Sequence, residues 1–123
     1  MVLDYNRDGS PDFLVTQVAA PTVLLENRAR DAHWLTVAPE GAGDAGINAR
    51  IVVTAGGRTQ QQIILAGGSY LAGPPREAYF GVGGATVVDR VVVRWADGAV
   101  TDVSHVTADH VLRVRHPDPA PPF

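Results

Sequence analysis

The chain has 123 residues, enough for one domain with a single hydrophobic core. It contains no cysteine, which excludes disulfide bonds, thiolate metal sites and thiol nucleophiles. Its 10 basic residues, all arginine, and 13 acidic residues give a net charge of −3 without a basic stripe, so we expect no nucleic-acid partner. Apolar runs such as Val91–Val93 are far too short for a membrane span, and we expect none.

The first segment of the chain has the spacing of a calcium-binding loop. Side-chain oxygens fall at loop positions 1, 3, 5 and 9, which are Asp4, Asn6, Asp8 and Asp12, and a glycine at position 6 permits a sharp turn. Ser10, at position 7, would offer its backbone carbonyl. Val15 stands where an EF-hand has a bidentate glutamate, and a strand follows instead of a helix. Hard oxygen ligands favour calcium, and the alternative is an acidic surface turn.

The rest of the chain predicts an all-β fold, because glycine and proline separate short runs rich in β-branched residues. We expect strands at 12–18, 22–26, 33–38, 47–55, 58–65, 77–82, 88–95, 99–104 and 110–115. Gly56-Gly57 and Asp97-Gly98 are hairpin turns, and Thr107–His110 is a short turn. No window of ten or more residues keeps a helical period, so we expect under about a tenth of the chain to be helical.

Alternation along these strands predicts which side chains are buried. Arg90, Val92 and Arg94 share one face of their strand, opposite a face that we expect to be buried. The expected core residues are Ile51, Val53, Val91, Val93, Trp95, Leu112 and Val114. Half-buried strands of this kind form an antiparallel β-sandwich or a partly open barrel, and the pattern leaves both open.

The sequence contains no motif whose spacing would bring together the residues of a catalytic or dinucleotide-binding site. Gly41–Gly46 matches a G-x-G-x-x-G string, but a strand follows it where a dinucleotide site needs a helix. Asp102, Ser104 and His105 are close in sequence, yet on a strand Ser104 and His105 point to opposite faces. The sequence therefore predicts no catalytic residue and no enzyme, and calcium is the one cofactor it predicts.

A small set of aromatic and basic side chains could form a ligand-binding face. These residues are Tyr70, Tyr79, Arg50, Arg58 and Arg76. The alternative is that they are ordinary edge and core residues.

Five segments together resemble the ASPIC/UnbV domain. They are His33–Val37, Ile47–Gln60, Ala66–Leu71, Phe80–Gly83 and Val91–Gly98, in order across roughly 33–115. In that family the domain typically follows FG-GAP/VCBS β-propeller repeats, as in cartilage-acidic-protein-like proteins. Asp4–Asp12 followed by Phe13–Thr16 resembles the calcium loop and strand of such a repeat. The resemblance implies that the metal ligands are Asp4, Asn6, Asp8, Ser10 and Asp12.

The resemblance also implies how the chain is organised. Residues 1–30 would be a partial propeller repeat with a calcium-loop hairpin, 31–116 the ASPIC/UnbV-like β-domain and 117–123 a proline-rich tail. Residues 13–26 hold two apolar strands that would normally belong to a propeller blade. We expect them to pair with the edge of the sandwich or with a second copy of the chain, giving a homo-oligomer through the N-terminal strands.

The function that this organisation implies is a non-enzymatic binding or adhesion module with a calcium-binding loop. Its ligand would be a protein or a carbohydrate. The alternative is an accessory or capping domain of a larger propeller-containing enzyme of natural-product biosynthesis or hydrolysis. Family members point to an extracellular or periplasmic location, although the first residues of this chain have no secretory-signal pattern.

Overall fold

The structure is a computed structural model that describes residues 1–29, 31–41, 44, 46–68 and 70–118. The described residues form strands and no helix. The strands are β1 (Val2–Leu3), β2 (Asp12–Gln17), β3 (Ala20–Leu25), β4 (His33–Glu40), β5 (Arg50–Ala55), β6 (Arg58–Ile63), β7 (Ala78–Gly83), β8 (Val87–Arg94), β9 (Val100–Thr107) and β10 (His110–Arg115). The predicted all-β fold is confirmed.

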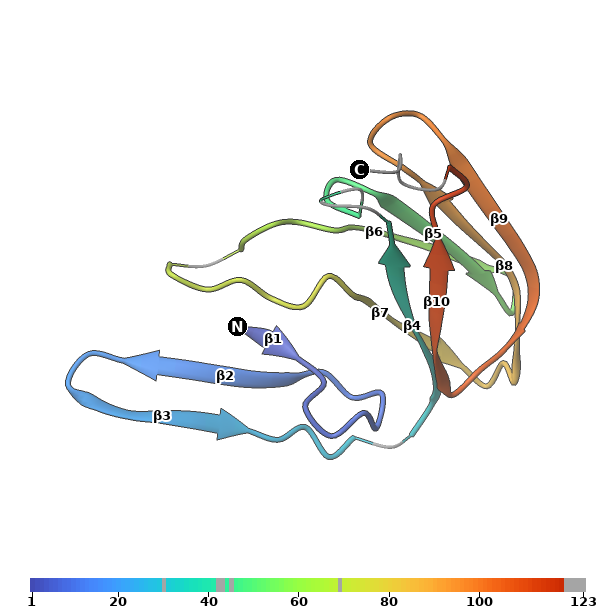
Figure 1. The fold of residues 1–123 in the computed structure, drawn as a ribbon. Coiled ribbons are helices and arrows are strands. Elements are labelled where there is room, and N and C mark those ends of the chain that lie inside the picture. The colour runs from blue at the N-terminus through green and yellow to red at the C-terminus, as the bar shows by residue number, and fades with distance from the viewer. Residues whose placement is uncertain (30, 42–43, 45, 69, 119–123) are drawn as a thin grey trace.

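Two of the three sheets face each other as a sandwich (Figure 1). One has the order β10-β4-β7 and the other β6-β5-β8-β9. The β10–β4 ladder is parallel, and the other ladders are antiparallel. The described strands do not close into a barrel. The edges β6 and β7 are instead joined by side-chain amides, because Gln60 and Gln62 donate to backbone carbonyls of β7 at 2.8 and 2.5 Å.

The core lies between these two sheets and follows the alternation of the strands. Its largest fully buried side chains include Leu35, Ile51, Val53, Phe80, Val91 and Val93. Trp95 and Val114 are buried as expected, whereas Leu112 is only partly buried at the margin. Val92 lies on the outer face with Arg90 and Arg94, yet it is only 9% exposed. Its flanking arginines and its cross-strand neighbour Val52 leave it little contact with solvent.

Some predicted strand boundaries were wrong. The segment before β5 is a turn and not a strand, because Asn48 adopts a left-handed conformation (φ 63°) and Ile47 donates its N–H to the carbonyl of Asp44 at 2.8 Å. Strand β9 extends to Thr107, beyond the expected end at residue 104. The short strand β1 was not expected from the sequence. Residues 119–123 of the predicted tail, residues 42, 43 and 45 of the glycine-rich string, and Ser69 lie outside the described residues.

The N-terminal residues form a sheet of their own, with the order β1-β2-β3, that projects to one side of the sandwich (Figure 1). The expected pairing with the edge of the sandwich was wrong. Strand β2 takes β1 on one side and β3 on the other, and the Met1 amino group donates to the carbonyl of Leu14. All six residues of β3 stay exposed. Pairing with a second copy of the chain remains a prediction.

Candidate functional site

The loop between β1 and β2 folds around two buried carboxylates. Asp4 is 5% exposed and accepts the N–H groups of Asp8 and Gly9 at 3.1 and 2.8 Å. Asp12 is fully buried and accepts the N–H groups of Tyr5 and Asn27 at 3.1 and 2.8 Å. Neither carboxylate forms an ion pair with a described residue. These hydrogen bonds satisfy the carboxylates only in part, because each carboxylate oxygen has two acceptor positions.

The other predicted ligands are placed differently. Asn6 is exposed, and its side-chain oxygen accepts the N–H of Asp8 at 3.3 Å. Asp8 is half-buried and accepts the N–H of Ser10 at 2.8 Å. The Ser10 hydroxyl donates to the carbonyl of Ala29 at 2.7 Å, which fastens the loop to the segment after β3. The structure thus brings all five predicted residues into one loop, with Asp4 and Asp12 at its interior.

This loop is docked on the outer face of the β10-β4-β7 sheet. Gly9 lies flat against the indole of Trp34, so that a Cβ at position 9 would fall 2.1–2.3 Å from three indole atoms. Arg7 forms an ion pair with Glu77 at 2.6 Å. The Tyr79 hydroxyl donates to the same carboxylate at 3.0 Å. Burial raises the pKa of Tyr79 well above its ordinary range, with the charge of Glu77 adding to the effect, so Tyr79 stays neutral.

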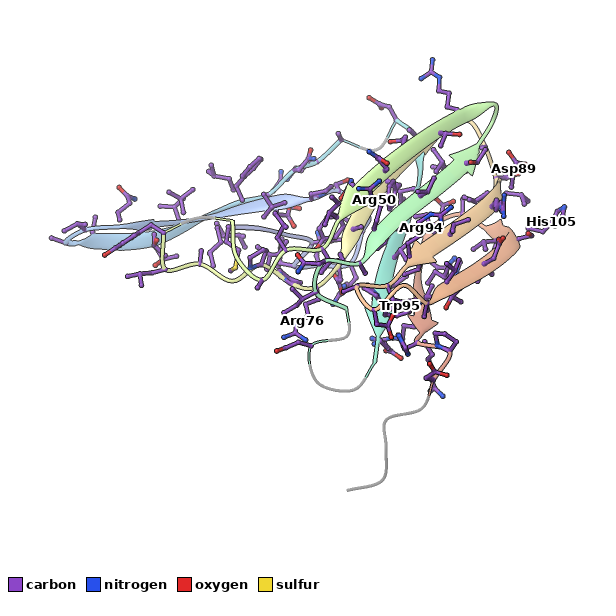
Figure 2. The ribbon with its side chains drawn as sticks, turned by 90° about the horizontal axis from the view of Figure 1, so that it is seen from above. Arg50, Arg76, Asp89, Arg94, Trp95 and His105 are labelled. Carbon is purple, nitrogen blue, oxygen red and sulfur yellow. The ribbon has the colours of Figure 1, made fainter. Side chains whose placement is uncertain are left out.

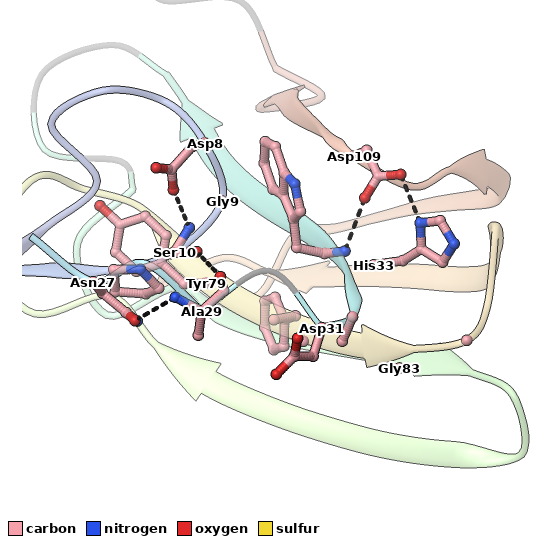
Figure 3. A pocket seen from close by; sticks show the side chains of 16 residues that line it. Asp8, Gly9, Ser10, Asn27, Ala29, Asp31, His33, Tyr79, Gly83 and Asp109 are labelled. Carbon is pink, nitrogen blue, oxygen red and sulfur yellow. Dashed lines mark hydrogen bonds and ion pairs between the residues drawn. The ribbon is translucent and has the colours of Figure 1, made fainter.

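A cavity of about 670 Å³ lies between the docked loop and the sandwich (Figure 3). Its polar lining includes Asp8, Ser10, Asn27, Asp31, His33 and Asp109, and its aromatic lining is Trp34, Tyr79 and Phe80. Glycines of β7 and of the following turn, at 81, 83 and 84, leave room beside them. Carboxylates, an amide and aromatic faces in one cavity suit a small polar ligand with an apolar face.

One wall of the cavity is fixed by Asp109. Its carboxylate contacts His33 Nδ1 at 2.7 Å and accepts the N–H of Trp34 at 3.2 Å, as Figure 3 shows. The hydrogen bond from His33 lowers the pKa of Asp109. Asp109 therefore stays ionised and holds His33 and the backbone of Trp34 in place. An ionised carboxylate has no proton to donate.

The structure does not assemble the other groups of residues that the sequence singled out. Tyr70 is 88% exposed, Arg76 pairs with Asp44 at 2.6 Å, and Arg50 lies on the outer face of β5, so the five residues of the suggested binding face are dispersed. Among the described residues, Asp102 pairs with Arg90 and forms no hydrogen bond or ion pair with the side chain of Ser104 or His105. The residues after Gly46 form a turn and then β5, which gives no helix N-terminus for a dinucleotide.

Comparison with known proteins supports the resemblance found in the sequence. The family model described as ASPIC and UnbV matches residues 40–121, most of the chain. The chain belongs to the ASPIC and UnbV family. The match begins at the last residue of β4 and takes in β5 to β10, so the central strand of the β10-β4-β7 sheet lies almost entirely before it. No curated protein matches the sequence.

The N-terminal loop and hairpin lie outside the residues matched by the ASPIC and UnbV family. Their assignment to an FG-GAP/VCBS repeat, and the domain boundaries that follow from it, therefore remain predictions. Trp34 and His33, which line the cavity, also precede the match. Across the described residues, no helix has the length and hydropathy that crossing a bilayer requires.

One cluster within the ASPIC and UnbV domain was missed in the sequence. Asp97, His116 and Asp118 each have an atom that could bind a metal ion, and these three atoms lie within 4.8 Å of one another. His116 Nε2 is 3.0 Å from Asp97 Oδ2. The imidazole of His116 packs edge-on against the ring of Trp95, with the ring centroids 4.7 Å apart. A hydrogen bond from the N–H of Ala99 lowers the pKa of Asp97, with His116 contributing. The pair ties the β8–β9 turn to the end of β10. The sequence could not predict this cluster, because strands β9 and β10 separate Asp97 from His116 along the chain.

Proposed function

We propose that this chain is a non-enzymatic binding module whose loop at residues 4–12 is stiffened by calcium and whose ligand enters the cavity beside that loop. The observation that carries the proposal is the position of the loop. Its Gly9 covers Trp34, while Asp8 and Ser10 line the cavity, so any ion that fixes the loop also fixes a wall of the cavity. The proposed ligand is a protein segment or a carbohydrate, since aromatic faces beside carboxylates and amides suit both.

The chemistry of the loop supports calcium as the ion. Two carboxylates with no more than 5% exposure and no ion pair to a described residue are costly to bury unless a cation lies nearby. The remaining candidate donors, from Asn6, Asp8 and Ser10, are also oxygens, and calcium accepts six to eight oxygen ligands in flexible geometry. Asp4, Asn6, Asp8, Ser10 and Asp12 would hold the ion. Calcium would supply charge compensation and rigidity.

Calcium should raise the melting temperature of the protein. With a dissociation constant on the order of 10⁻³ M, about 5 mM calcium adds roughly 1 kcal/mol to the free energy of unfolding, because it binds the folded loop. A thermal melt in calcium and in a chelator measures this difference. Asp8→Ala should abolish it. Asp89→Ala, which removes an exposed carboxylate of β8, should keep it.

Two results would contradict the calcium proposal. An equal rise in the wild type and in both variants would place the ion elsewhere, for example at Asp97, His116 and Asp118. No rise in any protein would mean that hydrogen bonds alone support the loop.

A second candidate function is that of an accessory or capping domain of a larger propeller-containing enzyme. The exposed N-terminal sheet favours it. Val18 is fully exposed, and Phe13 and Leu25 are each 53% exposed, so this sheet presents apolar side chains that a soluble monomer usually covers. A propeller blade would cover them, and so would a second copy of this chain. Both candidates are consistent with an extracellular or periplasmic location, which stays part of the proposal.

Removing residues 1–30 should lower the melting temperature by several degrees and leave a folded sandwich. The main core cluster lies within Leu35–Val114, but the deletion uncovers Trp34 and Tyr79. We also expect the full chain to self-associate at high concentration and the shortened chain to stay monomeric, because the exposed strands are gone. Calorimetry measures the melting temperature, and light scattering measures the mass of the protein in solution. Unchanged melting and mass would show that the N-terminal sheet neither supports the sandwich nor associates.

A further inference from the structure

Two arginines lie directly opposite each other on the outer face of the four-stranded sheet. Arg50 of β5 is the cross-strand partner of Arg94 of β8. Both are exposed, whereas their chain neighbours Ile51 and Val93 are fully buried. Side chains at such positions have Cβ atoms about 4.5–5.5 Å apart. Two positive charges therefore occupy one patch of the surface, on adjacent strands in Figure 2.

No described residue neutralises this pair. With the described part of the chain, neither arginine forms an ion pair or a side-chain hydrogen bond, in contrast to Arg7, Arg28, Arg76, Arg90, Arg113 and Arg115. On this face Asp102 lies opposite Val92, and both of its oxygens accept from Arg90. Like charges directly opposite each other destabilise a sheet. An anion between the two guanidinium groups would remove that repulsion.

The two ends of the cross-strand row are apolar. Ile63 of β6 pairs with Arg50, and Val100 of β9 pairs with Arg94. They are 47% and 48% exposed. The row Ile63–Arg50–Arg94–Val100 thus offers a charged centre between two apolar side chains, which suits an anionic group attached to a less polar ligand.

We propose that Arg50 and Arg94 bind a tetrahedral oxyanion, a sulfate or phosphate group. A guanidinium group binds two oxygens side by side through its planar fork. A carboxylate has two oxygens and fills one fork, whereas a sulfate or phosphate group has at least three free oxygens and can engage both. None of these residues lines the cavity beside the N-terminal loop. The proposal is therefore independent of calcium and of the cavity ligand.

The test is an NMR titration of the full chain with sodium sulfate and with sodium phosphate at constant ionic strength. We expect saturable shifts of the Nε–H signals of both arginines, with a dissociation constant on the order of 10⁻³ M. The anion that binds more tightly, sulfate or phosphate, identifies the group. Acetate should bind more weakly than either. Arg50→Gln and Arg94→Gln should each weaken binding about tenfold or more, since one fork is lost.

Arg58→Gln is the matched control. Arg58 also lacks an ion pair among the described residues and belongs to the same sheet, but it pairs with Ala55 and lies outside this row. We expect this variant to bind the anion as the wild type does. Equal weakening in all three variants would overturn the proposal, because it would reveal only general charge attraction. A lack of saturable shifts at the two arginines, or an acetate response as strong, would overturn it as well.

The melting temperature provides a second readout that also verifies folding. Without the anion and at low salt, Arg50→Gln should melt at the same temperature as the wild type or higher, because the repulsion is gone. Adding sulfate at constant ionic strength should raise the melting temperature of the wild type more than that of Arg50→Gln. An equal rise in both proteins would contradict binding at this pair.

Discussion

A single methyl group at position 9 should separate the N-terminal loop from the sandwich. Gly9 has φ +86°, and an added Cβ would lie 2.1–2.3 Å from three atoms of the Trp34 indole. Neither the left-handed backbone nor the indole can relieve this overlap in place. Backbone strain and overpacking together should cost about 2–4 kcal/mol for Gly9→Ala. Because the core cluster lies elsewhere, the loop should undock while the sandwich stays folded.

Hydrogen exchange can locate this loss. The amides of Ser10 and Asn27 donate to carboxylates of the loop and should lose protection in Gly9→Ala, while amides of β5 and β8 keep theirs. Gly57→Ala is the matched control, since Gly57 also has a positive φ (+75°) but nothing within 4 Å of its added Cβ. It should cost about 1 kcal/mol from backbone strain alone. An equal loss of stability in Gly9→Ala and Gly57→Ala would show that the contact with Trp34 contributes nothing to the docking of the loop.

Phe80→Ala should destabilise the sandwich itself by about 3–5 kcal/mol. Phe80 is 2% exposed and belongs to β7, whose side chains meet those of the opposite sheet. Its removal loses buried apolar surface and leaves a cavity that the surrounding strands can fill only in part. This is a large fraction of the stability of an ordinary domain, about 5–15 kcal/mol. The midpoint of urea unfolding measures the change.

Phe13→Ala is the control for that measurement. Phe13 lies in β2 and is 53% exposed, so the same truncation should change the free energy of unfolding by no more than about 1 kcal/mol. A loss at Phe13 as large as that at Phe80 would indicate that the exposed N-terminal sheet is covered in solution by another copy of the chain.

The strands were predictable because their signal is local. Ile51 and Val53 lie two residues apart between Arg50 and Thr54, and Val91 and Val93 lie two residues apart between Arg90 and Arg94. This spacing places each apolar pair on one face only in an extended strand. One error came where a single residue overrides the pattern. Asn48 adopts a left-handed conformation and ends the strand pattern before Arg50. Pairing partners carry no such signal, so the parallel contact of β10 with β4 and the separate N-terminal sheet could not be predicted.

The candidate site was predictable only in its composition. Spacing alone grouped Asp4, Asn6, Asp8, Ser10 and Asp12, since a short loop keeps its ligands close in sequence. The cavity beside the loop joins residues as distant as Asp8 and Asp109, and the sequence gives no sign of their proximity. Trp34 was expected only as part of a family segment, and its contact with Gly9 was not expected.

The sequence by itself determined the all-β class, the main strands, the buried faces of β5 and β8, and membership of the ASPIC and UnbV family. These follow from alternation and motifs, which are properties of neighbouring residues. Only the tertiary structure decided that the strands form a sandwich, that the acidic loop docks on Trp34, and that Arg50 faces Arg94. Each of these is a contact between residues far apart in the chain, fixed by strand pairing and packing, which short-range patterns do not encode.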